Sequence, residues 1–172
     1  LPQKNLAVEL LQKLLNDNIR VRSRKNAVQA RSFALLLANT LQKYENRAVS
    51  AGHVVEELID MAKEFRDANQ RGEDLGLNDD ELAFYDALAE NESAVEVMGN
   101  EELTIIAREL LKYIRSNVTI DWTLKESARA RIRVIVKRIL RKYGYPPDLA
   151  EKATDTVLEQ AKLVASDWIT PM

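Results

Sequence analysis

Apolar residues recur along this chain at the three- and four-residue spacings of α-helices, and no long apolar–polar alternation predicts a strand. The spacing predicts helices over about residues 5–16, 23–44, 50–71, 78–90, 100–116, 125–142 and 148–168, with residues 91–99 as a short irregular connector. One apolar face comprises Ala128, Ile132, Ile135, Val136, Ile139 and Tyr143. We therefore expect an all-α fold, a single helical domain of about seven helices in an irregular bundle.

Several residues mark where the predicted helices begin and end. Asn78 and Glu81 have the spacing of a capping box at the start of the fourth helix. Ser50 has the side chain of a helix cap ahead of the third. Gly144 suits the left-handed residue that ends the sixth helix, and Pro147 suits the first turn of the seventh.

Composition narrows the kinds of site that this chain can hold. It has 172 residues, no cysteine and one histidine, His53, so disulfides, thiolate metal sites and His-pair metal sites are excluded. Neither a GxxxxGK[ST] loop nor a GxGxxG motif is present, so no nucleotide site is placed. We predict no catalytic, cofactor-binding or metal-binding residue, no small-molecule substrate and no membrane span.

The net charge of −2 conceals a strong separation of charges along the chain. Residues 72–107 carry eleven acidic side chains and no Lys or Arg, so the remaining residues together carry a net charge of +9. The sixth predicted helix carries the densest group of cations. Its candidate contacts to DNA or a protein partner are Lys125, Arg129, Arg131, Arg133, Lys137, Arg138, Arg141 and Lys142.

Three interpretations of this basic helix stay open from the residues alone. It neutralises the acidic region 72–107 within the fold, it contacts the phosphates of nucleic acid, or it docks on an acidic face of another protein. The two tryptophans, Trp122 and Trp168, flank helices and fit core or interface anchors better than base-stacking platforms.

A family resemblance rests on two segments, LGLNDDELAFYDALAEN (residues 75–91) and residues 102–168, which contain the motif DWTLKESARARIRVIVKRILRKYGYP. With the helix of residues 44–71, they resemble the C-terminal region of the R (restriction, motor) subunit of type I restriction–modification enzymes. The resemblance covers about the last three quarters of the chain. It transfers no catalytic residue, because the family's nuclease, Walker and helicase motifs all belong to segments upstream of this one.

The resemblance implies an ATP-dependent DNA translocase and endonuclease as the parent subunit, with ATP and Mg²⁺ bound upstream, in a bacterial or archaeal cytoplasm. The chain opens in a helical phase without Met, and we expect it to be part of a longer protein. Residues 1–48 are then a helical connector from the upstream part, and residues 49–172 the C-terminal helical domain, together one continuous all-α unit. The expected function is non-catalytic assembly with the modification (methyltransferase) and specificity subunits. The alternative is contact with double-stranded DNA through the basic helix 125–142.

Overall fold

The computed structural model describes residues 2–47, 49–118, 122 and 124–169, and within them the side chains from Leu6 to Ala165 except that of residue 69. These residues form seven α-helices and no strand, which confirms the all-α prediction. The helices are α1 (Pro2–Ser23), α2 (Ala27–Glu45), α3 (Ala51–Leu75), α4 (Asp79–Ala89), α5 (Glu92–Asn117), α6 (Glu126–Lys142) and α7 (Pro147–Ile169).

Side-chain caps fix where the central helices begin. The Ser50 hydroxyl accepts a hydrogen bond from the His53 amide at the start of α3. The predicted capping box of α4 is present, with the Asn78 side chain accepting from the Glu81 amide at 2.8 Å and the Glu81 carboxylate accepting from the Asn78 amide at 3.0 Å. Gly144 has the left-handed φ of 75° that the end of α6 requires.

The prediction of an irregular connector over residues 91–99 is wrong. Asn91 caps a helix there, because its side chain accepts a hydrogen bond from the Ser93 amide at 3.0 Å. This first part of α5 buries Ala94 and stops at Gly99, whose φ of 81° and ψ of 163° break the helical path. The helix then continues in a new direction after this kink. Glycine suits the position because it adopts such a φ without strain.

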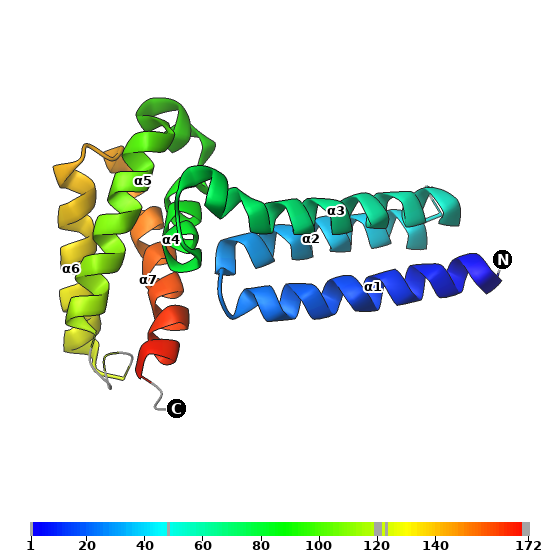
Figure 1. Ribbon diagram of the computed structural model, residues 1–172, viewed down its shortest axis with the longest axis horizontal. Helices are drawn as coiled ribbons and strands as arrows, with labels where there is room; N and C mark the ends of the chain where they lie inside the picture. Colours follow the sequence, from blue (N-terminus) through cyan, green and yellow to red (C-terminus); the bar gives the residue numbers. More distant parts are fainter. Residues whose placement is uncertain (1, 48, 119–121, 123, 170–172) are drawn as a thin grey trace.

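Two apolar cores lie at the two ends of the molecule (Figure 1). Helices α1, α2 and α3 form an elongated bundle whose buried apolar residues are Val8, Leu15, Phe33, Leu37, Val54, Leu58, Met61 and Phe65. Helices α4 to α7 surround a larger core, whose fully buried side chains include Phe84, Leu88, Leu103, Ile106, Leu110, Ile114, Ile132 and Leu140. The apolar contacts thus group α3 with α1 and α2, and the expected division between residues 48 and 49 stays a prediction.

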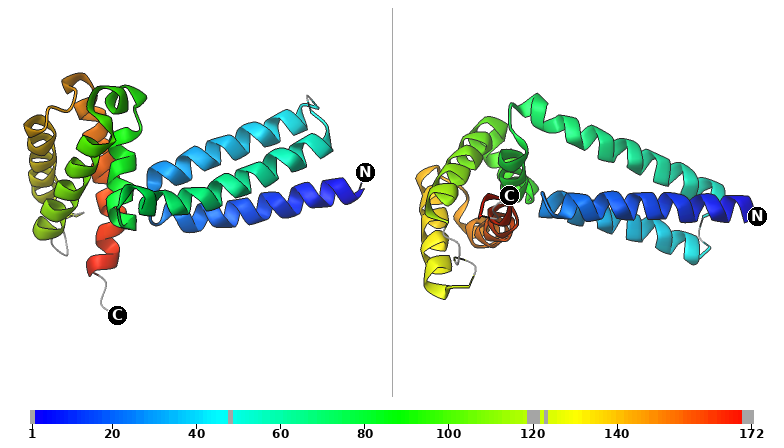
Figure 2. Two further views of the ribbon diagram at one scale, coloured as in Figure 1. Left: turned by 45° about the horizontal axis from the view of Figure 1, so that its top comes forward. Right: turned by 60° about the horizontal axis from the view of Figure 1, so that its bottom comes forward.

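Helix α6 lies at the side of the molecule away from α1–α3, with α4 and α7 between them (Figures 1 and 2). Trp122, just before α6, is only 3% exposed and belongs to the larger core, as expected for an anchoring aromatic residue. The side chain of Trp168 lies outside the described residues. The arrangement leaves the outer side of α6 available to other molecules.

Candidate interaction surface on α6

The inner face of α6 packs as its apolar spacing predicts. Ile132, Val136, Ile139 and Leu140 are buried against the core of α4–α7. Because the helix is anchored through this face, its cationic side chains lie along its flanks and its outer side.

One flank of α6 forms ion pairs with α7. Arg133 Nη1 donates to Asp155 Oδ1 at 2.6 Å, and its other terminal nitrogen donates to Glu151. Lys137 Nζ lies 2.7 Å from Glu151 Oε2. These hydrogen bonds raise the pKa of Arg133, and those from Lys137 and Arg133 lower the pKa of Glu151. Two of the predicted contact residues are therefore engaged within the fold.

The opposite flank is tied to α5 near the end of the helix. Lys142 Nζ donates to Glu109 Oε1 at 3.1 Å, and the Tyr143 hydroxyl donates to the other oxygen of the same carboxylate. The hydrogen bond from Tyr143, followed by that from Lys142, lowers the pKa of Glu109. Lys142 is thus a third predicted contact residue that helps to hold the helices together.

The arginines on the outer side of α6 are exposed to solvent. Arg131, Arg138 and Arg141 are exposed, and none has an ion-pair partner among the residues that the structure describes. They fall on one face with Val134, which is 55% exposed. Lys125 and Arg129 are exposed as well, at the beginning of the helix. We call Arg131, Val134, Arg138 and Arg141 the outer face of α6.

The acidic region 72–107 makes its described ion pairs with other helices. Glu81 pairs with Arg108 of α5 at 3.7 Å, Glu90 pairs with Arg31 of α2 at 3.5 Å, and Asp86 pairs with Arg71 of α3. The acids that pair with α6 in the described part of the chain, Glu109, Glu151 and Asp155, lie outside this region. Neutralisation by residues 72–107 therefore does not account for the cations of α6.

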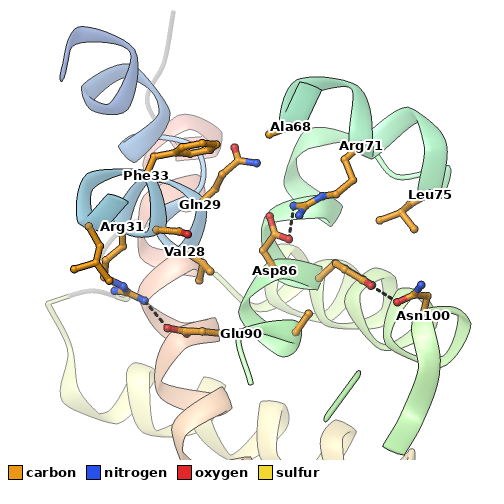
Figure 3. Close-up of a pocket in the computed structure, with 14 residues that line it drawn as sticks. Val28, Gln29, Arg31, Phe33, Ala68, Arg71, Leu75, Asp86, Glu90 and Asn100 are labelled. Carbon is orange, nitrogen blue, oxygen red and sulfur yellow. Dashed lines mark hydrogen bonds and ion pairs between the residues drawn. The ribbon is translucent and has the colours of Figure 1, made fainter. Parts of the chain in front are cut away.

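A buried polar joint connects the two apolar cores. Asp86 of α4 is only 6% exposed, accepts from Asn26 Nδ2 at 2.7 Å, and accepts from the Arg71 guanidinium. Burial raises the pKa of Asp86, although Arg71 and Asn26 both act in the opposite direction. Figure 3 shows the Arg71 and Asp86 side chains pointing toward one another between α3 and α4.

Gln160 of α7 forms the second half of this joint. Its side chain is fully buried, its Oε1 accepts from the Ala27 amide at 2.9 Å, and its Nε2 donates to the Lys25 carbonyl at 2.6 Å. One amide side chain thus satisfies two backbone groups at the turn between α1 and α2. We call Asn26, Arg71, Asp86 and Gln160 the polar joint.

A groove of about 890 Å³ opens beside the joint, between α2, α3 and α4 (Figure 3). Val28, Phe33 and Leu75 contribute apolar walls, while the Tyr85 hydroxyl donates to Asn100 Oδ1 at 2.6 Å. Arg31 bridges Glu90 and Glu159 at its edge. Arg31, Arg71, Asp86 and Glu90 of the groove are therefore all engaged in ion pairs within the fold.

One residue of the polar joint, Asp86, can be recognised in the sequence, although the apolar periodicity does not predict the joint itself. Asp86 stands alone in a helix whose neighbouring residues from Leu82 to Leu88 are all apolar and all buried. A charged residue in such a run must be paired, because burying an isolated carboxylate is costly. Its partners come from 15 and 60 residues away, a distance that no local pattern spans.

In the described part of the chain, one histidine and no cysteine join the acidic residues as possible metal ligands. No group of three His, Cys, Asp or Glu side chains is placed there to hold a metal ion. His53 lies exposed in the first turn of α3, 3.0 Å from Glu57. Among the described helices, none has the length and apolar character needed to cross a lipid bilayer.

Comparison with known proteins shows the protein family to which the chain belongs. The family model described as type I restriction enzyme HindI endonuclease subunit-like, C-terminal, matches residues 1–167. The chain belongs to this family and corresponds to the C-terminal region of a type I restriction endonuclease subunit.

Two relatives show how much of such a subunit this chain represents. It is 41% identical over 166 residues to the type I restriction enzyme HindI endonuclease subunit of Haemophilus influenzae, covering 96% of this chain and 16% of that protein. It is 35% identical over 167 residues to a putative type I restriction enzyme endonuclease subunit of Methanocaldococcus jannaschii, covering 92% of this chain and 15% of that protein. No solved structure matches the chain significantly. The chain thus spans less than a fifth of the length of these relatives.

Proposed function

We propose that this region is a non-catalytic assembly module, which docks its endonuclease subunit on another protein of the restriction complex through the outer face of α6. The observation that carries the proposal is the set of three exposed arginines, Arg131, Arg138 and Arg141, that the described fold leaves without ion partners. Long stretches of one sign on a helix are unfavourable unless a partner supplies the opposite charge.

Exposed apolar side chains on α6 and on the neighbouring helix α5 favour a protein partner. Val134 lies among the arginines, and the neighbouring helix α5 exposes Ile105 and Tyr113, 46% and 45% accessible respectively. Arginine and tyrosine are enriched in protein interfaces, where their apolar parts are buried and their polar ends find partners. A complementary surface would combine carboxylates with an apolar centre.

Within the complex that the family implies, the partner would be the modification or the specificity subunit. ATP and Mg²⁺ chemistry would then belong to the segments that precede this region in the parent subunit. The region itself would determine whether the subunit joins the complex, and the charged outer face would control orientation and association rate.

The test reverses the three charges in the complete subunit, as R131E/R138E/R141E. A matched control, K43E/K63E/R66E, reverses three exposed cations on α2 and α3, away from α6. We expect the first variant to lose co-elution with the modification and specificity subunits in the absence of DNA, and the control to keep it. Undiminished assembly of a correctly folded R131E/R138E/R141E subunit would overturn the proposal.

The second candidate function is contact with double-stranded DNA through the same arginines. The spacing of Arg131, Arg138 and Arg141 along one helix face supports it, since rows of cations can follow a phosphate backbone. If these arginines contact phosphates, R131A/R138A/R141A should reduce the salt dependence of duplex binding by about 0.9 in log–log slope per lost contact. Intact assembly with this reduced slope would favour DNA over the protein partner.

A further inference from the structure

Helix α1 carries a second apolar stripe, on the side opposite to the core of its own bundle. Val8 and Leu15 are buried against α2 and α3, at 4% and 0% exposure. Leu6, Leu10 and Leu14 follow one another at intervals of four residues and are 55%, 60% and 51% exposed. We call Leu6, Leu10 and Leu14 the α1 leucine stripe.

A helix that is apolar on two opposite sides is normally covered on both. The sequence pattern of residues 5–16 is that of one amphipathic face, but the structure separates its leucines onto two sides of α1. Three adjacent leucines in water form a contiguous apolar patch rather than the scattered single residues common on protein surfaces. Asp17 follows Leu14 on the same side of α1, so the leucine stripe occupies the first part of the helix.

The position of the stripe indicates what covers it. The family match assigns this chain to the C-terminal part of its relatives, of which it covers 16% and 15%, so a long part of those proteins lies ahead of the segment that aligns with α1. A preceding segment belongs to the same polypeptide as α1, so it is held at high effective concentration near the stripe.

We propose that the α1 leucine stripe is an intramolecular interface, on which an amphipathic helix from the preceding part of the same polypeptide packs as the fourth helix of the α1–α3 bundle. Its apolar residues would recur at three- and four-residue spacing to match Leu6, Leu10 and Leu14. The inference rests on family membership and on α1, and it is independent of the docking proposed for α6.

The experiment is hydroxyl-radical footprinting of the complete subunit, read residue by residue by mass spectrometry. Leu10 and Leu14 are compared with Leu35 and Leu36 of α2, which have the same chemistry and are 63% and 43% exposed. We expect Leu10 and Leu14 to be oxidised several times more slowly than Leu35 and Leu36. Equal oxidation of all four leucines would overturn the proposal.

A second measurement identifies what covers the stripe. In residues 1–172 alone, Leu10 and Leu14 should react as fast as Leu35 at every protein concentration. Protection that grows with concentration would instead show a second copy of the chain on the stripe and would overturn the intramolecular assignment. In the complete subunit, L10K/L14K should increase the oxidation of apolar residues upstream of α1, whereas the matched variant L35K/L36K should not.

Discussion

Asn26 and Asp86 are sixty residues apart in sequence, and Asn26 Nδ2 donates a 2.7 Å hydrogen bond to Asp86 Oδ2 between the two apolar cores. The other end of the same amide, Asn26 Oδ1, accepts from the Gln29 amide and caps α2. A single buried side chain thus defines both the beginning of a helix and its attachment to α4. This bond makes the joint between the two cores a specific contact.

We expect Asn26→Ala to lower the free energy of unfolding by about 2–3 kcal/mol, since it removes a helix cap and a buried hydrogen bond to a carboxylate. The matched control is Asn78→Ala, which removes an exposed cap and should cost about 1 kcal/mol. Urea denaturation measures both. In an Asp86→Ala background the effect of Asn26→Ala should shrink toward that of the control, and full additivity would contradict the joint.

Replacing Gln160 by leucine should leave the Ala27 amide and the Lys25 carbonyl without their partner. We expect a loss of about 2–3 kcal/mol in the free energy of unfolding, because both groups are at a partly buried turn. Hydrogen exchange of the Ala27 amide should accelerate in parallel. Gln42→Leu, at an exposed position of α2, is the control and should leave that exchange rate unchanged.

Tyr145 provides a pH signature of the larger core. Burial, with a smaller contribution from Glu90, raises the pKa of its hydroxyl to about 12, and that hydroxyl donates to the Leu88 carbonyl at 2.8 Å. The unfolded chain loses this proton near pH 10 while the folded chain keeps it, so stability falls as pH rises between the two values.

The comparison with Tyr145→Phe isolates this effect from the other titrating groups. Between pH 9.5 and pH 11 the wild type should lose about 1 kcal/mol of unfolding free energy relative to the variant. Chemical denaturation at a series of pH values measures the difference. A difference that is constant over this range would show that Tyr145 ionises equally readily in the folded and unfolded chain.

Truncating two aliphatic residues of α6 should have different effects, one on stability and the other on assembly. Ile132→Ala, at a site only 1% exposed, should lower the unfolding free energy by about 2–4 kcal/mol. Val134→Ala, on the outer face, should change it by less than about 0.5 kcal/mol but weaken assembly of the complete subunit. Thermal unfolding and co-elution give the two readouts, and a Val134→Ala subunit that assembles like wild type would weaken the case for an apolar contact there.

The helical periodicity of this sequence predicts most of the fold because each helix buries one apolar face. The caps at Ser50 and Asn78 and the end at Gly144 are predictable for a different reason, because their chemistry is local to each helix end. The prediction for residues 91–99 is wrong because Gly99 interrupts the helical pattern directly after a short helix that Asn91 caps.

The distribution of charge along the sequence predicts the basic helix, but it does not predict which of its cations form ion pairs within the fold. The pairs of Arg133 and Lys142 depend on how α7 and α5 are placed beside α6, and that placement is set by tertiary packing. For the same reason the sequence does not distinguish Leu10 from Leu15, which point to opposite sides of α1. The leucine spacing alone fits one face, and only the position of α2 and α3 determines which members are covered.

The most direct test of docking through α6 is arginine labelling with a dicarbonyl reagent, read by mass spectrometry, in the complete subunit before and after it joins the modification and specificity subunits without DNA. Arg131, Arg138 and Arg141 should lose most of their reactivity on assembly, while Arg66 of α3, exposed and distant from α6, should keep it. Unchanged labelling of Arg131, Arg138 and Arg141 in a fully assembled complex would contradict the proposed docking surface.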